Sequence, residues 1–336
     1  MTIVVTGRRN VLLAAAAGAS TAAAAFPARA QAPASQGSDW PNRAVRIVVP
    51  FGAGGPNDVM ARIVGERLRE RLGQPFVVEN RPGAGGSTGT LLVSQSAPDG
   101  YTFLFHSSAV TIAPALNPRQ AIDPRRDLTP VSLVTDVPMT VVARPGAPGF
   151  GSMAEALATA RRNPGSVTVA TSGVGSANHL ALAMLGAMAK TEMVHVPYRS
   201  TAQSVTAVIA GEVNLAIAGI VEALGHYREG RVKLLAVTTG RRSEVLPEVP
   251  TIGETVQGYA VPLWFAMWAP PRLPKPILDR ISAELAAMRD VPAVRDRFLS
   301  LGAPPLMTPP DALAARAAEE MPRWQRLVAE AGIQTD

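Results

Sequence analysis

The chain contains no cysteine among its 336 residues. This excludes structural disulfides, a thiol nucleophile, a cysteine-ligated metal and a lipid anchor on cysteine. Histidine is scarce too, and its four residues are scattered without the spacing of zinc ligands. Neither G-x-x-x-x-G-K-[ST] nor G-x-G-x-x-G at a strand-to-helix turn occurs, so nucleotide binding has no support. We therefore expect no metal and no cofactor.

Concentrated positive charge is also lacking. The formal net charge falls from +6 to +3 without residues 1–30, because these hold three arginines (Arg8, Arg9 and Arg29) and no acid. No run of Lys and Arg, and no stripe of basic and aromatic residues, follows in the remainder. Nucleic-acid binding requires such a footprint, so no nucleic-acid partner is expected.

The first thirty residues have the organisation of an export signal. A charged start with Arg8 and Arg9 precedes the apolar run 11–25, and Ala-Arg-Ala at 28–30 forms a small-x-small cleavage site. The apolar run is too short and alanine-rich for a membrane span. The paired arginines fit both a twin-arginine and an ordinary secretory signal. We predict a periplasmic protein, cleaved near Ala30, with a flexible lead-in over 31–40.

Beyond this lead-in, apolar strand patterns alternate with helix patterns, which predicts an α/β fold with parallel strands and right-handed crossovers. Strands are expected at 45–49, 76–79, 102–105, 139–143, 167–170, 194–197, 215–218, 233–237 and 262–268. Helices are expected at 58–72, 88–96, 153–162, 177–189, 201–210, 221–227, 277–289, 291–301 and 311–331, the last interrupted near Pro322.

The order of these elements predicts two lobes. The strand–helix rhythm pauses over 113–130, resumes in a second series, and ends in a helical tail without strands. We assign 40–138 plus 264–336 to lobe 1, and 139–263 to lobe 2. The chain then crosses twice between the lobes, near 137–144 and 261–269. Two crossover strands form a hinge, and ligand clefts lie beside such hinges.

Two segments share one plan, in which a strand leads through a glycine-rich turn into a helix. They are Phe51–Asp58 (FGAGGPND) and Ser172–His179 (SGVGSANH). Such a turn leaves backbone N–H groups free at a helix start, where the helix dipole adds positive charge. We predict an anion site between two such turns, formed by Phe51, Gly54, Gly55, Asp58, Ser172, Gly173, Gly175, Ser176 and Asn178. The alternative for each turn is a capped helix start that binds nothing.

Further candidates follow neighbouring strands at the same sheet edge. His106 and Ser107 come directly after the strand 102–105, where open α/β sheets place ligand groups. Tyr198, Arg199 and Ser200 follow the strand 194–197, where Tyr198 can close over a ligand and Arg199 can pair with a second carboxylate. A surface arginine beside a buried tyrosine is an equally good interpretation.

An enzyme must also be considered. Residues 85–89 (GGSTG) match the G-x-S-x-G nucleophile elbow of serine hydrolases, with Ser87 as nucleophile. That elbow requires the serine on a sharp turn directly after a strand, whereas a loop containing Pro82 intervenes here. A chance match is the simpler explanation, and no catalytic residue is expected.

The segment PFGAGGPNDVMAR resembles the signature PxxPGGxxDxxAR of the Bug family, the periplasmic receptors of tripartite tricarboxylate transporters. The similarity continues in order through VVENRPGAGGSTGT, APDGYTFLF, TSGVGSANHLA, VHVPYRS, VKLLAVTTGRRSEVLPEVPT and WAPPRLP. It implies a type II periplasmic binding fold, in which two α/β lobes close on a small carboxylate. The partners implied are membrane permease subunits, and the receptor itself is expected to be a monomer.

Three departures from the family pattern concern the ligand. Gly52-Ala53-Gly54 stands where Ala-Pro-Gly is usual, Ser200 replaces a glycine, and Asn214 replaces an aspartate. The first leaves the turn intact, whereas Ser200 changes the cleft wall. The sequence does not choose between a citrate-like or dicarboxylic acid, an acidic amino acid and an aromatic acid. It also leaves open whether the receptor serves a permease or a sensor.

Overall fold

The structure, a computed structural model, describes residues 39–117 and 122–331. The predicted export signal, 1–30, lies outside these residues. Within them, no helix combines the length and the apolar composition that a membrane crossing needs.

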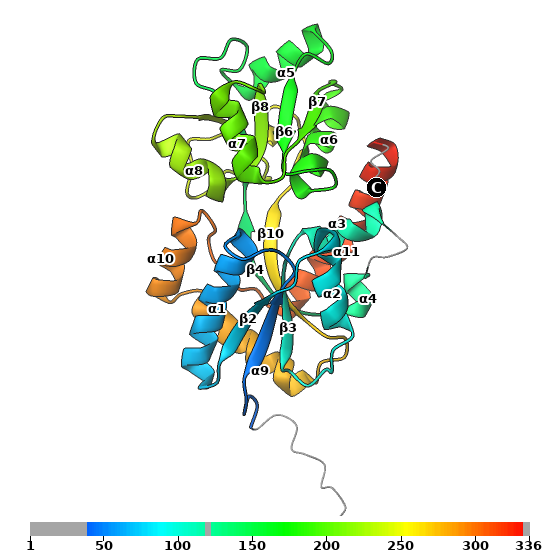
Figure 1. Cartoon of the computed structure of the whole chain (residues 1–336), viewed down its shortest axis with the longest axis vertical. Coiled ribbons are helices and arrows are strands. Elements are labelled where there is room, and N and C mark those ends of the chain that lie inside the picture. The colour runs from blue at the N-terminus through cyan, green and yellow to red at the C-terminus, as the bar shows by residue number, and fades with distance from the viewer. Residues whose placement is uncertain (1–38, 118–121, 332–336) are drawn as a thin grey trace, which may run out of the picture. The chain divides into compact units, whose positions relative to one another are not determined.

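Two five-stranded sheets form the frame, with the orders β2-β1-β3-β10-β4 and β7-β6-β8-β5-β9 (Figure 1). The strands of the first are β1 (Val45–Val49), β2 (Phe76–Asn80), β3 (Thr102–Ser107), β4 (Thr129–Val137) and β10 (Leu263–Ala269). Those of the second are β5 (Met139–Ala143), β6 (Thr168–Thr171), β7 (Val194–Pro197), β8 (Leu215–Gly219) and β9 (Lys233–Val237).

Both sheets are mixed, which corrects the expectation of parallel strands alone. In the first, β1 is parallel to β2 and β3, whereas β10 is antiparallel to β3 and β4. In the second, β6 is parallel to β7 and β8, whereas β5 is antiparallel to β8 and β9. The antiparallel strands β10 and β5 are those that enter each sheet from the other one.

Helices cover both faces of each sheet. Around the first lie α1 (Pro56–Leu72), α2 (Ser87–Ser94), α3 (Ala109–Leu116), α4 (Pro124–Asp127), α9 (Lys275–Met288), α10 (Pro292–Ser300) and α11 (Pro310–Ala331). Around the second lie α5 (Met153–Arg162), α6 (Ala177–Ala189), α7 (Thr201–Ala210) and α8 (Ile220–Arg228). Single 3₁₀ turns occur at Ala84–Gly86 and Ile252–Glu254.

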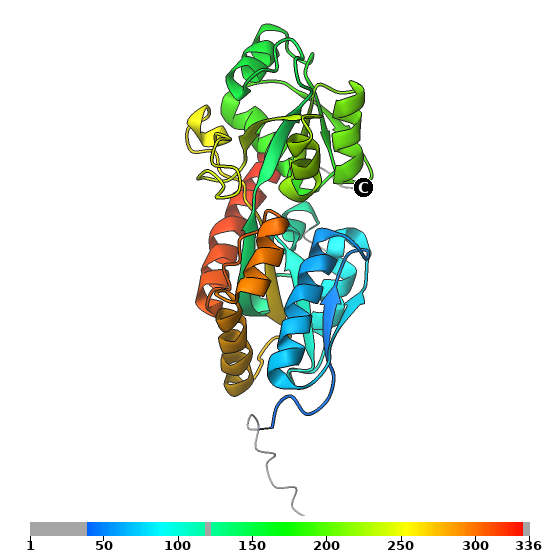
Figure 2. The same cartoon turned by 90° about the vertical axis from the view of Figure 1, so that its left-hand side faces the viewer.

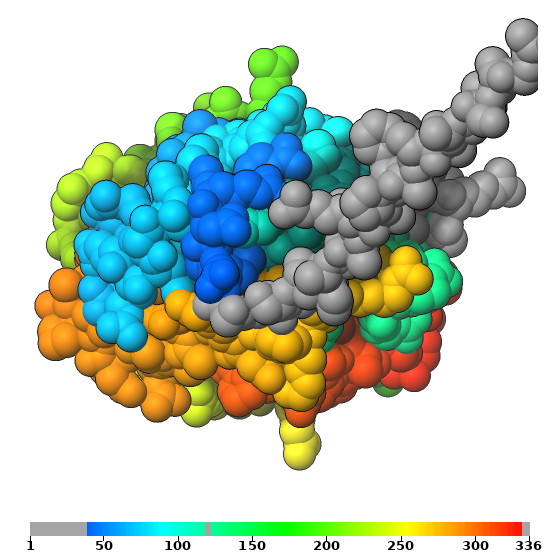
Figure 3. Space-filling model, turned by 90° about the horizontal axis from the view of Figure 1, so that it is seen from below, coloured from blue at the N-terminus to red at the C-terminus, as the bar shows by residue number. Residues whose placement is uncertain are grey.

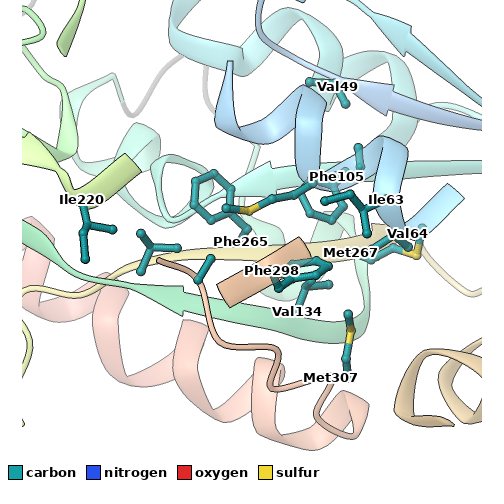
Figure 4. Packing of buried hydrophobic residues seen from close by; sticks show 14 of the residues in the cluster. Val49, Ile63, Val64, Phe105, Val134, Ile220, Phe265, Met267, Phe298 and Met307 are labelled. Carbon is teal, nitrogen blue, oxygen red and sulfur yellow. The ribbon is translucent and has the colours of Figure 1, made fainter. Parts of the chain in front are cut away.

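Side chains of the first sheet alternate between two hydrophobic clusters. Phe105 and Met267 pack toward α1, α9 and α10, while their neighbours Leu104 and Trp268 pack toward α2, α3 and α11. This follows from the period of two along a strand. Figure 4 shows the first of these clusters, with Phe298 of α10 against the sheet. Burying each large side chain contributes about 1.5–3 kcal/mol.

The helices α1 and α9 are neighbours at the end of the first sheet where β1 begins. Figure 3 views this end, with the light-blue residues of α1 near the amber residues of α9. An ion pair between Arg71 Nε and Glu284 Oε2, at 2.9 Å, joins the two helices. Because both side chains reach solvent, this pair contributes at most about 1 kcal/mol.

The chain passes between the sheets twice, as the sequence predicts. β4 ends at Val137 and β5 begins at Met139, so one residue, Pro138, separates strands of different sheets. The return leads into β10, which begins at Leu263. Near these crossings the Ile220 N–H donates to the Pro138 carbonyl at 3.1 Å, and the Val261 N–H donates to the Thr238 carbonyl at 2.7 Å. The exact lobe boundaries, 40–138 plus 264–336 and 139–263, stay a prediction.

The strand β4 and the helix α3 were not predicted from the sequence. β4 contains polar residues that a buried strand disfavours, but tertiary partners satisfy them. Ser132 Oγ donates to the Thr308 carbonyl at 2.9 Å, and Thr135 Oγ1 donates to the Pro304 carbonyl at 2.8 Å. The sequence cannot reveal acceptors so distant along the chain, so most of this strand received no prediction.

The last helix corrects two further expectations. α11 continues through Pro322 without the predicted interruption. It also reaches beyond the first sheet, because Trp324 and Leu327 belong to the hydrophobic cluster of the second sheet. Arg323 Nη2 donates to the Ala260 carbonyl at 2.5 Å. Figure 2 shows this helix in red, extending from the first sheet toward the second.

Candidate functional site

A cleft of about 670 Å³ lies between the two sheets. Its volume equals that of roughly twenty water molecules, at about 30 Å³ each in the liquid. Both glycine-rich turns line it. The lining residues are Phe51, Gly54, Gly55, Pro56, Asn57, Val59, Met60, Gly85, Ser107, Ala109, Val137, Ser172, Val174, Gly175, Ser176, Ala177, Asn178, Ser200, Thr201, Ala202, Gly219, Val221, Glu222, Leu263, Phe265 and Leu301.

Helix N-termini dominate the walls of this cleft. Among the residues that the structure describes, the first residues of α1, α3, α6 and α7 line it, and α8 contributes its second and third. The first turn of a helix has backbone N–H groups without intrahelical acceptors, and its dipole favours negative charge. No Arg, Lys or His occurs among the described lining residues. The cleft thus offers main-chain and neutral donors to an anion.

In the first lobe, Asp58 fixes the turn that enters α1. Gly54 has φ = +82°, and its N–H donates to Asp58 Oδ2 at 2.9 Å. Arg62 Nη2 and Asn80 Nδ2 donate to Asp58 Oδ1 at 2.9 and 3.0 Å. Burial alone would raise the pKa of Asp58, but the hydrogen bonds from Arg62, Gly54 and Asn80 outweigh it, so the pKa is lowered. The ionised carboxylate is therefore occupied in holding the turn.

In the second lobe, His179 has the corresponding position. The Gly175 N–H donates to His179 Nδ1 at 3.1 Å, and the His179 N–H donates to Ser176 Oγ at 3.2 Å. The His179 ring stacks on His195, with 3.9 Å between ring centroids. Burial, with a smaller contribution from His195, lowers the pKa of His179 to about 4. The ring is thus neutral near pH 7 and can accept the glycine N–H.

The two turns share a local design. In each, a glycine N–H donates to the side chain four residues later, within the first turn of the helix. The amides of Gly54 and Gly175 are therefore used internally and are not free for a ligand. The amides of the first helical turns, such as those of Asn57 in α1 and Ala177 in α6, have no intrahelical acceptor.

Nine of the predicted site residues line the cleft: Phe51, Gly54, Gly55, Ser107, Ser172, Gly175, Ser176, Asn178 and Ser200. Gly173 and the buried Asp58 do not line it. Asn178 holds its turn to the second sheet, because Nδ2 donates to the Ile217 carbonyl at 2.6 Å. Ser200 Oγ accepts the Gln203 N–H and so caps α7.

His106, Tyr198 and Arg199 do not line the cleft in this structure. His106 is buried behind Phe51, with its ring edge-on at 5.3 Å between centroids, and burial lowers its pKa to about 3. Tyr198 and Arg199 line a separate hollow, where the Tyr198 hydroxyl donates to Glu212 at 3.2 Å.

Several lining residues were missed by the sequence reasoning. Ala109, Thr201 and Glu222 lie in the first turns of α3, α7 and α8, and each of these helices starts soon after a strand ends. The signal was present for α8, since Gly219 ends β8 immediately before the helix. On the same ground, every strand-to-helix junction at this sheet edge could have been predicted to line the cleft.

The arrangement around Ser87 does not have the geometry of a nucleophile elbow. Ser87 opens α2 after a loop and the 3₁₀ turn that follow β2, whereas the elbow needs a serine directly after a strand. Ser87 and His106 line one small cavity apart from the cleft. In residues 39–117 and 122–331, no hydrogen bond joins their side chains.

Comparison with known proteins identifies the family of this chain. Residues 60–333 match the family described as tripartite tricarboxylate transporter family receptor, a family of solute-binding receptors and not of enzymes. The fold is similar to that of the periplasmic binding protein BugD, with a TM-score of 0.76 and 35% identity over 88% of this chain and 100% of BugD. The two-lobed type II periplasmic binding fold implied by the sequence is thereby confirmed.

Two similar structures contain carboxylates. MatC from Rhodopseudomonas palustris, solved with bound malate, has a TM-score of 0.74 and 34% identity over 86% of this chain and 100% of MatC. Another R. palustris protein, solved with adipate, has a TM-score of 0.77 and 31% identity over 88% of this chain and 99% of its own.

Proposed function

Since this chain belongs to the receptor family of tripartite tricarboxylate transporters, we propose that it binds a small dicarboxylate in the cleft between its lobes. The observation that carries this proposal is the set of helix N-termini around a cleft whose described lining has no cationic side chain. Malate in MatC and adipate in the R. palustris relative are both dicarboxylates, which supports this ligand class.

We propose different roles for the groups that face the cleft and for the side chains that hold the two turns. We propose that first-turn amides of α1 and α6, with the hydroxyls of Ser107 and Ser200, donate to the ligand carboxylates. Neutral donors suit an anion that must be released again, since bidentate arginine pairs would hold it more strongly. Asp58 and His179 act as positioning residues, and Tyr198 and Arg199 are left out of the proposed site.

Closure of the lobes is part of this proposal. A dicarboxylate is much smaller than the cleft of about 670 Å³, so it cannot contact both walls and exclude water at this opening. The two crossings at Pro138 and before β10 supply the hinge. Waters bridge the ligand to those polar groups of the walls that it does not contact directly.

A thermal-shift screen against malate, succinate, glutarate, adipate and citrate tests the proposal. A ligand that binds only the folded state adds about 2.7 kcal/mol of stability at a hundredfold excess over its Kd. The variant Gly55→Val should abolish this shift, because Gly55 lines the cleft and its backbone conformation accepts a side chain.

The matched control is Gly52→Val in the same turn. Gly52 has open space around it and does not line the cleft, so this variant should keep the shift. A shift that survives in folded Gly55→Val, or a screen in which no dicarboxylate raises the Tm, would contradict the proposed site.

For its location, we propose export to the periplasm with cleavage near Ala30, and the similarity to the periplasmic binding protein BugD supports this location. The proposed partner is the membrane permease of a tripartite transporter, and the receptor is proposed to act as a monomer. Loss of dicarboxylate uptake in a strain that lacks this protein would support a permease. Unchanged uptake with loss of a transcriptional response would instead favour a sensor.

A further inference from the structure

A single carboxyl group faces the anion cleft. Among the described lining residues, Glu222 is the one with an ionisable side chain. It lies in the first turn of α8, three residues after Gly219, the last residue of β8. A Cβ atom placed on Gly219, itself a lining residue, would lie 2.6 Å from Glu222 Oε2. The carboxyl group therefore sits directly over the backbone of the cleft wall.

Glu222 is half-buried, and it differs from the buried acids Asp58 and Glu320 in having no partner from another residue. Asp58 is paired with Arg62 at 2.9 Å, and Glu320 accepts from Arg316 at 3.4 Å and from Trp264 Nε1 at 2.9 Å. In the part of the chain that the structure describes, no ion pair or side-chain hydrogen bond involves Glu222. Burial raises the pKa of the Glu222 carboxyl, and a hydrogen bond from its own backbone N–H only partly opposes the rise.

A second acceptor without a donor lines the cleft from the other lobe. Asn57, in the first turn of α1, is 8% exposed, and its Oδ1 is buried without a hydrogen-bond partner. Buried acceptors left unpaired cost free energy, and an ionised carboxyl group costs more than an amide. Each wall of the cleft thus presents one acceptor that receives no hydrogen bond from another residue.

We infer that Glu222 selects a ligand that carries an ammonium group beside its two carboxylates, that is, an α-amino dicarboxylate. This inference rests on the proposed function, in which the helix N-termini hold the carboxylates. The ammonium group provides three donors and a positive charge, so it can pair with Glu222 and hydrogen-bond to Asn57. An unsubstituted dicarboxylate would leave Glu222 unpaired and add two like charges nearby.

The test compares ligands that differ only in the group at one carbon. Isothermal titration calorimetry at pH 7.5 measures aspartate, malate and succinate, and glutamate against glutarate, with the wild-type protein. Aspartate and glutamate should bind about 10- to 100-fold more tightly than succinate and glutarate, because a desolvated ion pair is lost in the latter. The affinity for malate, which has a neutral hydroxyl donor, should lie between those for aspartate and succinate.

The isosteric variant Glu222→Gln removes the charge and should erase this preference. Aspartate should lose about 10- to 100-fold in affinity, while succinate should bind equally or more tightly. The matched control is Glu229→Gln, which makes the same change just beyond the other end of α8, where Glu229 pairs with Arg231. This control should keep the wild-type order of ligands, and circular dichroism checks that both variants fold.

The possible outcomes separate this inference from the proposed function. If succinate binds the wild type as tightly as aspartate, or if folded Glu222→Gln keeps the preference for aspartate, the inference is wrong while the dicarboxylate site stands. If none of the five acids binds, the proposed function fails and the inference falls with it. If Glu222→Gln does not fold, the ligand affinities of the wild-type protein and of Glu222→Ser test the inference by the same criteria.

Discussion

At the residue scale, the side chains closest to the glycine turns act through the backbone. Asp58 and His179 each accept a glycine N–H, at 2.9 and 3.1 Å, and so fix the turn in front of their own helix. Asp58 was predicted to contact the ligand, and we now propose for it a positioning role. A carboxylate tied to Arg62 and Asn80 can lie near an anion site without repelling its ligand.

The first prediction concerns Asp58. Asp58→Ala should lower the free energy of unfolding by about 1–3 kcal/mol, because a buried, hydrogen-bonded charge is lost. The pKa of Asp58 is lowered in the folded protein from 3.8, so its stabilising effect is complete above pH 3.8 and is lost as the pH falls further. Urea unfolding at pH 7 and pH 3 measures both effects. Between these two pH values, Asp58→Ala should lose less stability than the wild-type protein.

The control for Asp58 is Asp279→Ala, which breaks the exposed i,i+4 pair with Lys275 on α9. Exposed pairs contribute little, so the change should stay within about 0.5 kcal/mol. Equal effects of the two substitutions would contradict the role assigned to Asp58.

The second prediction concerns His179. Its pKa falls from 6.5 to about 4 on folding, so the unfolded chain binds an additional proton between these pH values. Stability should therefore decrease as the pH falls from 6.5 to about 4. In His179→Gln the Tm should decrease less than in the wild type between pH 7.5 and pH 4.5. The decrease that remains includes the contribution of His106, whose pKa is about 3. An unchanged decrease in the variant would refute this assignment.

At the element scale, helix starts define the cleft and one long helix connects the two hydrophobic clusters. α11 packs against α3 and β4 of the first sheet and against α6 of the second. Its C-terminal part places Trp324, 1% exposed, in the second sheet's cluster. The lobes are thus linked by this helix as well as by the two hinge crossings.

The third prediction tests this link. Trp324→Ala should lower the free energy of unfolding by about 3–5 kcal/mol, because truncating a buried tryptophan leaves a cavity. Its exposed neighbour on the same helix serves as the control, since Gln325→Ala should change stability by less than about 0.5 kcal/mol. Equal unfolding midpoints for the two variants would show that α11 does not stabilise the second cluster.

At the scale of the whole molecule, the two sheets repeat one arrangement. In each, four strands run in one direction, and the single antiparallel strand comes from a crossing of the chain. The carboxyl ends of the parallel strands therefore face one cleft from both sides. A ligand favours the closed form only through the additional contacts that it makes there.

The fourth prediction follows from this arrangement. A dicarboxylate that bridges both walls should decrease the radius of gyration, measured by small-angle X-ray scattering with and without saturating ligand. The Gly55→Val variant should show no decrease under the same conditions. Saturation of the wild-type protein without compaction would contradict closure.

Much of this protein could be predicted from the sequence, because local patterns determine local structure. The helices at 153–162, 177–189 and 201–210 have the predicted bounds, and the resemblance over the chain gives the family correctly. Tertiary structure alone decided that β4 is a strand, since its polar groups are satisfied by residues 304–308. It also decided that Arg199 lies outside the cleft and that Glu222 lines it. A pattern specifies which residues share a face, whereas the groups that meet across that face depend on segments far apart in the chain.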